Sequence, residues 1–489
     1  MDQSEAPILD ALREHRRLER YGFTPPGHRQ GRGADPRVLE VLGDALRNDV
    51  LATAGLDDRK STNGYLENAQ ALMAEAVGAD HAFFSTCGSS LSVKASILAV
   101  TRGEGEILIG RDAHKSVVAG LVLSGLQPRW ISPRWDADLH LAHPPGPDDV
   151  DRMWERYPDA SAALITSPTP YGTCADLKAI ADTCHARGKP LIVDEAWGAH
   201  LPFHDDLPTW AMDAGADICV VSVHKMGMGF EQGSVYHLQG SLVDPVRLKQ
   251  CADVLATTSS NVLLYAAIDG WRRQMVENGN RLLSSTLDLV QGTRDRIEKL
   301  EGFHVLTDEL LGAEASHDLD RMHVLIDVSE CGISGYQAAD WLRENRRIDM
   351  GLSDHRRIEA TMSMADDQES ADRLLHALSA LGEASHEFPT PHPVELPSPA
   401  DLEPQTVDRP RDAFFGSVEA VPCEEASGRV CAEQLTPYPP GIPVLVPGEV
   451  INRAVVAYLR SGLEAGMVIP DAADQTLHTI RVVRDFSRG

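Results

Sequence analysis

Short apolar runs alternate with longer amphipathic stretches between about residues 80 and 240. Near-continuous apolar runs bounded by turn residues are typical of parallel strands buried on both faces, and the stretches between them have helical spacing. The runs that we predict to be strands are 81–85, 107–109, 129–131, 162–166, 190–193, 218–221 and 234–236, and the predicted helices are 90–100, 114–123 and 177–186. The pattern indicates an α/β fold whose parallel sheet carries helices on both faces.

The pattern changes on either side of this region. Residues 1–20 are predicted to be helical, and residues 262–300 to form long amphipathic helices that bridge to a second α/β unit. That unit is predicted to contain strands at 323–328 and 360–363 and a helix at 336–345. Residues 388–410 are rich in proline and acidic residues, and contain too few apolar residues for a core element. The boundaries that we expect are 1–60 for an N-terminal segment, 61–300 for a large domain, 301–385 for a small α/β domain, 386–412 for a linker and 413–489 for a C-terminal domain.

Composition and charge exclude several classes of function. The 489 residues suffice for two or three domains, and 43% hydrophobic with 24% charged residues is ordinary for a globular protein. A formal net charge of −28 argues against nucleic acid as a partner, because phosphate binding requires a basic face. No apolar stretch approaches the roughly 20 residues of a membrane span, and no signal-peptide pattern is present. The eight cysteines form no Cys-x-x-Cys pair, so we expect no metal site, and a cytoplasmic enzyme.

One lysine and one carboxylate follow two of the predicted strands. Lys225 lies just beyond the run 218–221, and Asp194 directly follows the run 190–193. Alone, each is explained as a solvated or turn-capping residue at the end of a strand. Together, at the edge of a parallel sheet where ligands bind, they offer an amine that can form an imine and a carboxylate that can keep a ring nitrogen protonated. Pyridoxal phosphate requires both groups from a protein.

A candidate phosphate site follows the first predicted strand. Gly88, Ser89 and Ser90 open a helix there, and its backbone N–H groups together with two hydroxyls suit a phosphate monoester. A plain serine N-cap explains these residues equally well. Ser222 and His224 are candidates for further phosphate donors, because they lie beside the lysine.

Several histidines and glycines carry weaker signals. His114 opens a helix, where its imidazole can stack on a planar ring, although a lone histidine is more often structural. The glycine-rich stretch 227–233 leads into a strand with the wrong spacing for a dinucleotide loop. His140 and His143 lie in a proline-rich loop without metal-ligand spacing, and we predict them to be surface residues.

Several segments, in the right order, resemble the ornithine/lysine/arginine decarboxylase family in its short form, without an N-terminal wing domain. The matching segments are 26–28, 83–90 with Lys94, 112–116, 167–172 with 176–177, 194–200, 224–225 with Gln232, 257–259, 438–443 and 447–449. The resemblance implies pyridoxal-phosphate-dependent fold type I, with a mostly parallel seven-stranded sheet and smaller C-terminal α/β domains. It also implies a homodimer with shared active sites, or a higher oligomer built from it.

The family pattern, carried over residue by residue, assigns roles to the matching positions. Lys225 would form the Schiff base, Asp194 would bond the ring nitrogen, and His114 and Ala196 would pack on the two faces of the ring. The phosphate would be held by Gly88, Ser89, Ser90, Ser222 and His224, and by Thr258 and Ser259 from the partner subunit. The candidates for contact with the substrate are Trp197, Asp354 and Glu449.

The sequence departs from the family pattern around the cofactor. Cys87, Val223 and Ser260 replace a common asparagine, threonine and proline. The loop 227–231 carries two glycines and a glutamate, which we expect to make it more flexible and more acidic than usual.

We expect decarboxylation of a basic L-amino acid (lysine, ornithine, arginine or a relative) that releases CO₂ and an amine. The catalytic residues would be Lys225, Asp194, His114 and His224, and either Lys225 or His224 would return a proton to the α-carbon. A pyridoxal-phosphate-dependent oxidase, oxidative decarboxylase or aminotransferase is the alternative that the altered loop motivates. A catalytically silent binding homologue is a second alternative, against which the intact Lys225 and Asp194 argue. The sequence does not identify which basic amino acid is the substrate. It also does not distinguish protonation of the carbanion from its oxidation.

Overall fold

The computed structural model divides into two compact units. The first comprises residues 1–99 and 190–281, and the second residues 100–189 and 282–489. The structure describes residues 1–52, 56–57, 64–101, 103–398, 401, 403, 405–438 and 441–484. Pro439 and Pro440, from the family-like segment 438–443, lie outside the described residues. The domain boundaries expected from the sequence remain a prediction.

The first unit carries four strands of a seven-stranded sheet, in the order β1-β10-β9-β8. These are β1 (His81–Ser85), β10 (Ser234–Leu238), β9 (Ile218–Ser222) and β8 (Leu191–Asp194). β8 and β9 run parallel, so their carboxyl ends meet at one edge, whereas β10 runs antiparallel to both β9 and β1. All residues of β8 and β9 are buried, which explains their unbroken apolar character.

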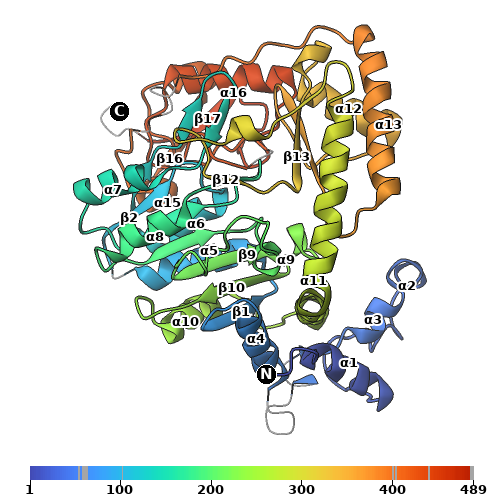
Figure 1. Cartoon of the computed structure of the whole chain (residues 1–489). Helices are drawn as coiled ribbons and strands as arrows, with labels where there is room; N and C mark the ends of the chain where they lie inside the picture. Colours follow the sequence, from blue (N-terminus) through green and yellow to red (C-terminus); the bar gives the residue numbers. More distant parts are fainter. Residues whose placement is uncertain are drawn as a thin grey trace. The chain divides into compact units, whose positions relative to one another are not determined.

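Helices accompany these strands in the first unit, and not all of them lie against the sheet (Figure 1). They are α1 (Pro7–Arg17), α2 (Pro36–Leu42), α3 (Asp44–Asn48), α4 (Tyr65–Ala76), α5 (Gly88–Val100), α9 (Val223–Met226) and α10 (Pro245–Leu255). The short α9 continues directly from β9 and bears Lys225. The sheet edge where β9 ends therefore presents this lysine.

The second unit carries the other three strands of the sheet, in the order β6-β2-β3. The elements of this part are β2 (Glu106–Gly110), β3 (Gln127–Ile131), β6 (Ala163–Thr166), the hairpin of β4 (Arg134–Asp136) and β5 (Leu141–His143), and the helices α6 (Lys115–Ser124), α7 (Pro147–Arg156) and α8 (Leu177–His185). β2 pairs in parallel with both β3 and β6. All seven predicted strands are present, and the prediction of a mostly parallel sheet is confirmed.

A second, antiparallel sheet of four strands follows, in the order β11-β13-β15-β14. Its strands are β11 (His304–Val305), β13 (His323–Asp327), β15 (Arg357–Thr361) and β14 (Leu352–Ser353), and β7 (Thr173–Cys174) pairs separately with β12 (Asp318–Leu319). Helices α12 (Gly335–Arg346) and α13 (Gln368–Ala384) pack on the four-stranded sheet through a shared apolar core that includes Ile326, Leu342 and Leu378 (Figure 1). The second α/β unit expected from the sequence is therefore present.

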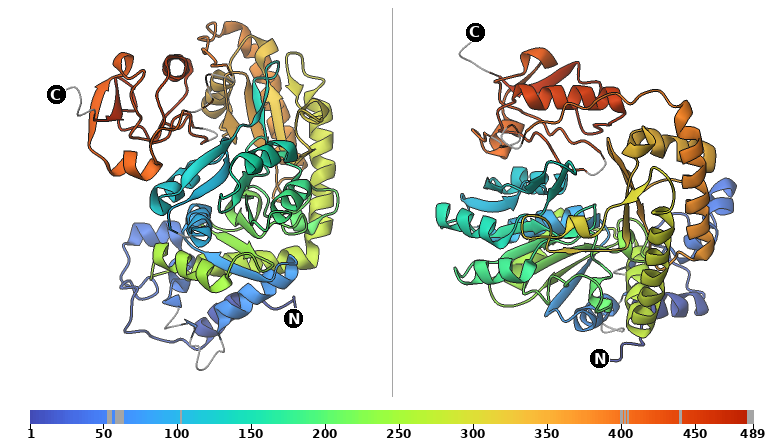
Figure 2. Two further views of the ribbon diagram at one scale, coloured as in Figure 1. Left: turned by 90° about the vertical axis from the view of Figure 1, so that its left-hand side faces the viewer. Right: turned by 45° about the horizontal axis from the view of Figure 1, so that its top comes forward.

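The C-terminal part has its own core (Figure 2). Its elements are α15 (Pro410–Phe415), β16 (Val418–Pro422), α16 (Arg453–Ala465) and β17 (Thr479–Val483), and β16 pairs antiparallel with β17. Short 3₁₀ turns occur elsewhere at η2 (Leu201–Phe203), η3 (Asp308–Leu310), η4 (Ser329–Cys331), η5 (Ser385–Glu387) and η6 (Cys423–Glu425).

Three details differ from the sequence-based expectations. The bridge is one helix, α11 (Val262–Ile297), rather than several. The strand predicted at 360–363 begins earlier, at Arg357. His143 is 1% exposed and its Nδ1 lies 2.8 Å from Ser316 Oγ, so the prediction that it lies on the surface was wrong. Among the described residues, none of the helices, α11 included, is both long and apolar enough to cross a membrane.

Candidate active site

Lys225 is a largely buried amine at the end of β9. Its Nζ lies 4.1 Å from the centroid of the Trp197 ring. Burial lowers the pKa of Lys225 to about 8, although the negative charge of Asp194 acts in the opposite direction. About a tenth of this amine is therefore uncharged at pH 7, and only the uncharged amine attacks an aldehyde.

Asp194 is the carboxylate whose negative charge acts on this lysine. It is 3% exposed and ends β8. Burial raises the pKa of Asp194, while Lys225 and the backbone N–H of Ala196 lower it. Its Oδ1 is buried and meets no hydrogen-bond donor among the described residues. An unpartnered buried acceptor is costly unless a ligand completes it, and a protonated ring nitrogen is such a ligand. Asp194 therefore fits pyridoxal phosphate.

The serines form a hydroxyl cluster at the start of α5. Gly88 has φ +71°, a conformation that favours glycine, and its N–H donates to Gln232 O at 3.0 Å. Ser222 Oγ donates to Ser89 Oγ at 2.7 Å, which ties the end of β9 to this helix. Ser90 follows within the first turn of α5. Hydroxyls and N–H groups at a helix start suit a phosphate, so this cluster also fits the cofactor.

His224 and the loop after it are held in place by the return of the chain into β10. His224 Nδ1 lies 3.1 Å from Gly233 O, and the N–H of Val223 donates to the same oxygen at 2.9 Å. A Cβ at Gly227 would stand 2.5 Å from Val223 O, and one at Gly229 would stand 3.0 Å from a methyl of Val223. These glycines therefore permit close packing against Val223, which differs from the flexible loop expected from the sequence.

Two other predicted cofactor residues lie in an exposed loop. Thr258 and Ser259 follow α10, and both are exposed. The N–H of Ser259 donates to Thr257 Oγ1 at 3.1 Å, which shapes the turn. Ala196 is half-buried beside Asp194.

The remaining candidates belong to the second unit. His114 caps α6, and its Nδ1 accepts the N–H of Ser116 at 3.2 Å, so the neutral ring carries its proton on Nε2. Glu449 is 1% exposed, and one of its oxygens accepts from Arg111 at 3.1 Å. Burial raises the pKa of Glu449 despite this guanidinium.

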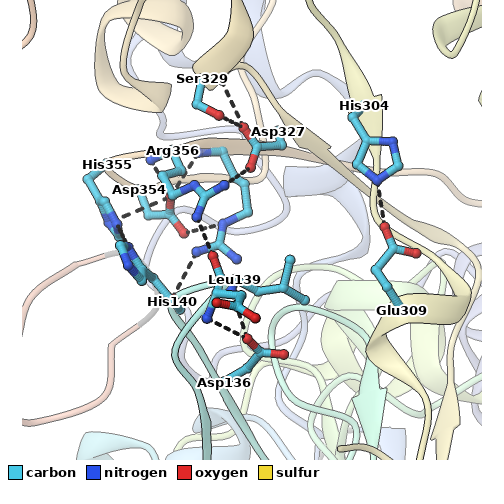
Figure 3. A network of polar contacts seen from close by, with 12 residues as sticks. Asp136, Leu139, His140, His304, Glu309, Asp327, Ser329, Asp354, His355 and Arg356 are labelled. Atoms are coloured by element: carbon cyan, nitrogen blue, oxygen red, sulfur yellow. Dashed lines mark hydrogen bonds and ion pairs between the residues drawn. The ribbon is translucent and has the colours of Figure 1, made fainter. Parts of the chain in front are cut away.

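Asp354 already has several partners inside the chain (Figure 3). It accepts from Arg357 Nε at 3.1 Å and from the N–H groups of Arg356 and Arg357 at 2.7 and 2.8 Å. Tyr171 donates its hydroxyl to Asp354 at 3.4 Å. These contacts explain Asp354 as a structural residue. Its contact with substrate remains a prediction.

One buried carboxyl beside Asp194 was not singled out by the sequence analysis. Glu195 is 0% exposed, and its Oε2 accepts from Cys219 Sγ at 3.1 Å and from the N–H of Ala211 at 3.3 Å. Successive residues of an extended chain point to opposite faces. The position of Glu195 directly after Asp194 therefore indicated a second carboxyl group on the other face of the sheet.

The fold and the site together define a pyridoxal-phosphate enzyme of fold type I. The family model described as the major domain of Orn/Lys/Arg decarboxylase matches residues 6–370, and the model of the C-terminal domain matches residues 399–476. The chain belongs to this family, and it is a pyridoxal-phosphate-dependent decarboxylase of a basic amino acid.

Named relatives and solved structures agree with this assignment. The chain is 38% identical over 489 residues to an arginine decarboxylase of Bacillus subtilis, with 99% of each chain covered. It is 37% identical over 485 residues to an arginine decarboxylase of Halalkalibacterium halodurans, covering 99% of this chain and 98% of the relative. The constitutive lysine decarboxylase of Escherichia coli has the same fold, with a TM-score of 0.80 and 20% identity, over 99% of this chain and 82% of that one.

Proposed function

We propose that the protein decarboxylates L-arginine to an amine and CO₂. The observation that carries the chemistry is the buried Lys225 amine beside the partnerless oxygen of Asp194. Support for arginine comes from the two relatives of 38% and 37% identity, because both are named arginine decarboxylases and match almost the whole chain. Lysine and ornithine are the competing substrates.

The geometry supports the following roles for these residues. When bound, pyridoxal phosphate accepts the electron pair that loss of CO₂ leaves on the α-carbon. Lys225 would bind the aldehyde carbon of the cofactor through Nζ, and Asp194 would hold a proton on its ring nitrogen. Lys225 or His224 would then deliver a proton to the α-carbon. His114 and Ala196 would pack against the ring and exclude water from its two faces.

The phosphate would be bound by Gly88, Ser89, Ser90, Ser222 and His224. Support comes from the hydroxyl pair of Ser222 and Ser89 at the start of α5 and from the left-handed backbone of Gly88. Because the cofactor phosphate carries negative charge, the N-terminal N–H groups of this helix would stabilise it.

A homodimer would complete this site. Thr258 and Ser259 lie in an exposed loop, where a second copy of the chain can receive them. Large apolar side chains of the first unit are also exposed, as expected of an interface: Phe23 (88%), Val41 (81%), Val254 (83%), Val246 (62%) and Phe230 (57%). A single peak at the mass of one chain in analytical ultracentrifugation would contradict this part of the proposal.

The substrate's cationic side chain requires a polar or aromatic partner. Trp197, Asp354 and Glu449 remain the proposed candidates. Trp197 already accommodates one cation, Lys225, against its ring. Asp354 and Glu449 each hold an arginine of this chain, so a guanidinium is a group that both can bind.

The test is product analysis on purified protein loaded with pyridoxal phosphate. Arginine, lysine and ornithine are supplied separately, with and without oxygen, and products are identified by mass. We expect agmatine and CO₂ from arginine at equal rates in both atmospheres. A keto acid or hydrogen peroxide would establish the oxidase or aminotransferase alternative, and turnover of lysine or ornithine in preference to arginine would reject arginine. No product from any substrate, together with no cofactor absorbance, would support the silent homologue.

A further inference from the structure

Glu195 is a buried carboxyl group, and no cation among the described residues lowers its pKa. Besides the Cys219 and Ala211 donors of Oε2, its Oε1 is buried and has no hydrogen-bond partner among the described residues. The other charged group that acts on it is Asp213, which has the same sign. An ionised carboxylate in such surroundings would cost several kcal/mol.

The other groups on this face of the sheet are neutral. Cys219 pairs with Val193 on β8 and with His237 on β10, so their side chains share a face. Burial lowers the pKa of His237 to about 3, and its ring packs edge-on against Trp210. Burial also raises the pKa of the Cys219 thiol well above its ordinary value. No cation among the described residues contributes to the pKa of Glu195, so none compensates a charge on it.

Asp194 and Glu195 are consecutive carboxyl groups in different surroundings. Burial raises the pKa of both groups, but the Lys225 cation and the Ala196 N–H oppose the rise at Asp194, whereas no cation opposes it at Glu195, whose pKa is raised well above its ordinary value. Two such groups divide the roles of anion and neutral acid between them. Asp194 is then the anion, and Glu195 keeps its proton.

Glu195 also anchors the turn that follows Asp194. Its N–H donates to Val220 O at 2.9 Å, and its carbonyl accepts from Gly198 at 2.8 Å. The side chain adds the contact with Cys219 on the neighbouring strand. The backbone beside Asp194 is thus fixed from three directions.

We propose that Glu195 is a positioning residue, which acts as a neutral carboxylic acid anchored on Cys219 to fix Asp194 and to keep a second negative charge away from it. This inference rests on the proposed contact of Asp194 with the cofactor ring. A neutral amide should replace a neutral acid, whereas an apolar side chain of similar size should not, because it lacks the acceptor for Cys219 and Ala211.

The experiment compares Glu195→Gln, Glu195→Leu and Asp194→Asn in the full chain. Two quantities are measured: the affinity of the apoprotein for pyridoxal phosphate, and the pH midpoint of the bound cofactor's visible absorbance. We expect E195Q to match the parent protein within about twofold, and E195L to lose about tenfold in affinity, as supporting residues of a site typically do. E195L should also shift the absorbance midpoint, which a purely structural role would leave in place.

Each outcome decides one point. If E195Q is as defective as E195L, the proposal that Glu195 is a neutral acid is wrong. If E195L behaves like the parent protein, the proposed positioning role is wrong. Asp194→Asn that binds and titrates normally would instead reject the proposed cofactor contact, whatever the Glu195 variants do. If E195L fails to fold, Cys219→Ser and Cys219→Ala replace it, because serine keeps a donor to Oε2 and alanine removes it. Identical midpoints and affinities in that pair would overturn the inference.

Discussion

The amine of Lys225 lies 4.1 Å from the centre of the Trp197 indole, so a cation–π contact and the charge of Asp194 both stabilise its protonated form. Burial acts against them and is the larger effect, since the pKa of Lys225 falls to about 8. The amine is therefore held close to the pH at which it must lose its proton to capture the cofactor.

The rate of cofactor capture should follow this pKa. Only the neutral amine attacks, so the rate at which apoprotein gains cofactor absorbance should rise with pH through about 8. Trp197→Leu should move the midpoint to lower pH by about half a unit, because losing the ring destabilises the cation by about 0.5–1 kcal/mol. Asp194→Asn should move it in the same direction. A shift to higher pH in either variant would contradict this account.

Removing the amine should abolish turnover. Lys225→Ala should lower kcat/KM for arginine on the order of 10³-fold or more, as loss of a nucleophile does in other enzymes. Lys225→Arg is the matched control, because it keeps the positive charge beside Asp194 but remains protonated. Equal defects in the two variants would assign the loss to the missing amine, and full turnover in Lys225→Ala would reject the site.

The Arg111–Glu449 pair should stabilise the second unit. Arg111 also donates to Val444 O at 3.1 Å and lies over the Trp130 ring, so Glu449→Ala would leave this largely buried guanidinium without its ion-pair partner. Unpairing a buried ion costs about 3–5 kcal/mol, which denaturant unfolding can measure. The double variant Arg111→Met with Glu449→Leu should recover much of this loss. If Glu449→Ala keeps full stability but raises KM for arginine, Glu449 is a substrate contact instead.

Glu195 should make stability fall as pH rises. Its folded-state pKa is raised by burial, so the unfolded chain releases a proton that the folded chain keeps above the ordinary value of 4.5. The free energy of unfolding then decreases by up to about 1.4 kcal/mol per pH unit from this one group. Glu195→Gln should remove that contribution, so its stability should fall less steeply than that of the parent protein as pH rises above 4.5. Parallel pH dependences for the two proteins would show that Glu195 is ionised.

The stacked pair His140–His355 should have the opposite pH dependence (Figure 3). His140 Nδ1 lies 3.2 Å from His355 Nε2, a bond that needs one nitrogen without a proton. The pKa of His140 is lowered by burial and by the guanidinium groups of Arg356 and Arg357, although the carboxylates of Asp354 and Asp136 raise it. Burial is also the main cause of the lowered pKa of His355. The stability of the parent protein should consequently fall as pH drops below 6.5, because the unfolded chain then binds more protons.

His355→Phe, which keeps a ring but cannot be protonated, should lose less stability than the parent between pH 7 and pH 5.5 in thermal unfolding. His304→Gln is the control of opposite sign. Burial lowers the pKa of His304, but contacts with Glu309 and Glu298 raise it by more, so the net pKa is raised. The contribution of His304 to stability is therefore present at low pH and lost as pH rises. A His355→Phe protein with the parent's pH dependence would contradict the prediction.

The sequence was informative where one residue type has one physical explanation. Apolar runs placed all seven strands of the large sheet, and the residues that end them placed Lys225 and Asp194 at the sheet edge. The side-chain partners were beyond reach, because they come from distant segments. His143 is buried and bonds Ser316, which lies 173 positions away. The packing of the glycines after Lys225 on Val223 is local, but it depends on how the loop folds back.

The short segment that bears Lys225 is closed upon itself, since Val223 and His224 both bond the carbonyl of Gly233. Met228, Phe230 and Glu231 are exposed within the loop that these bonds close, whereas Gly229 between them packs against Val223. A protein engineer can therefore vary these three exposed side chains while keeping Gly229 and the loop length: such changes should alter the outer surface of the loop and leave the lysine's backbone where it is.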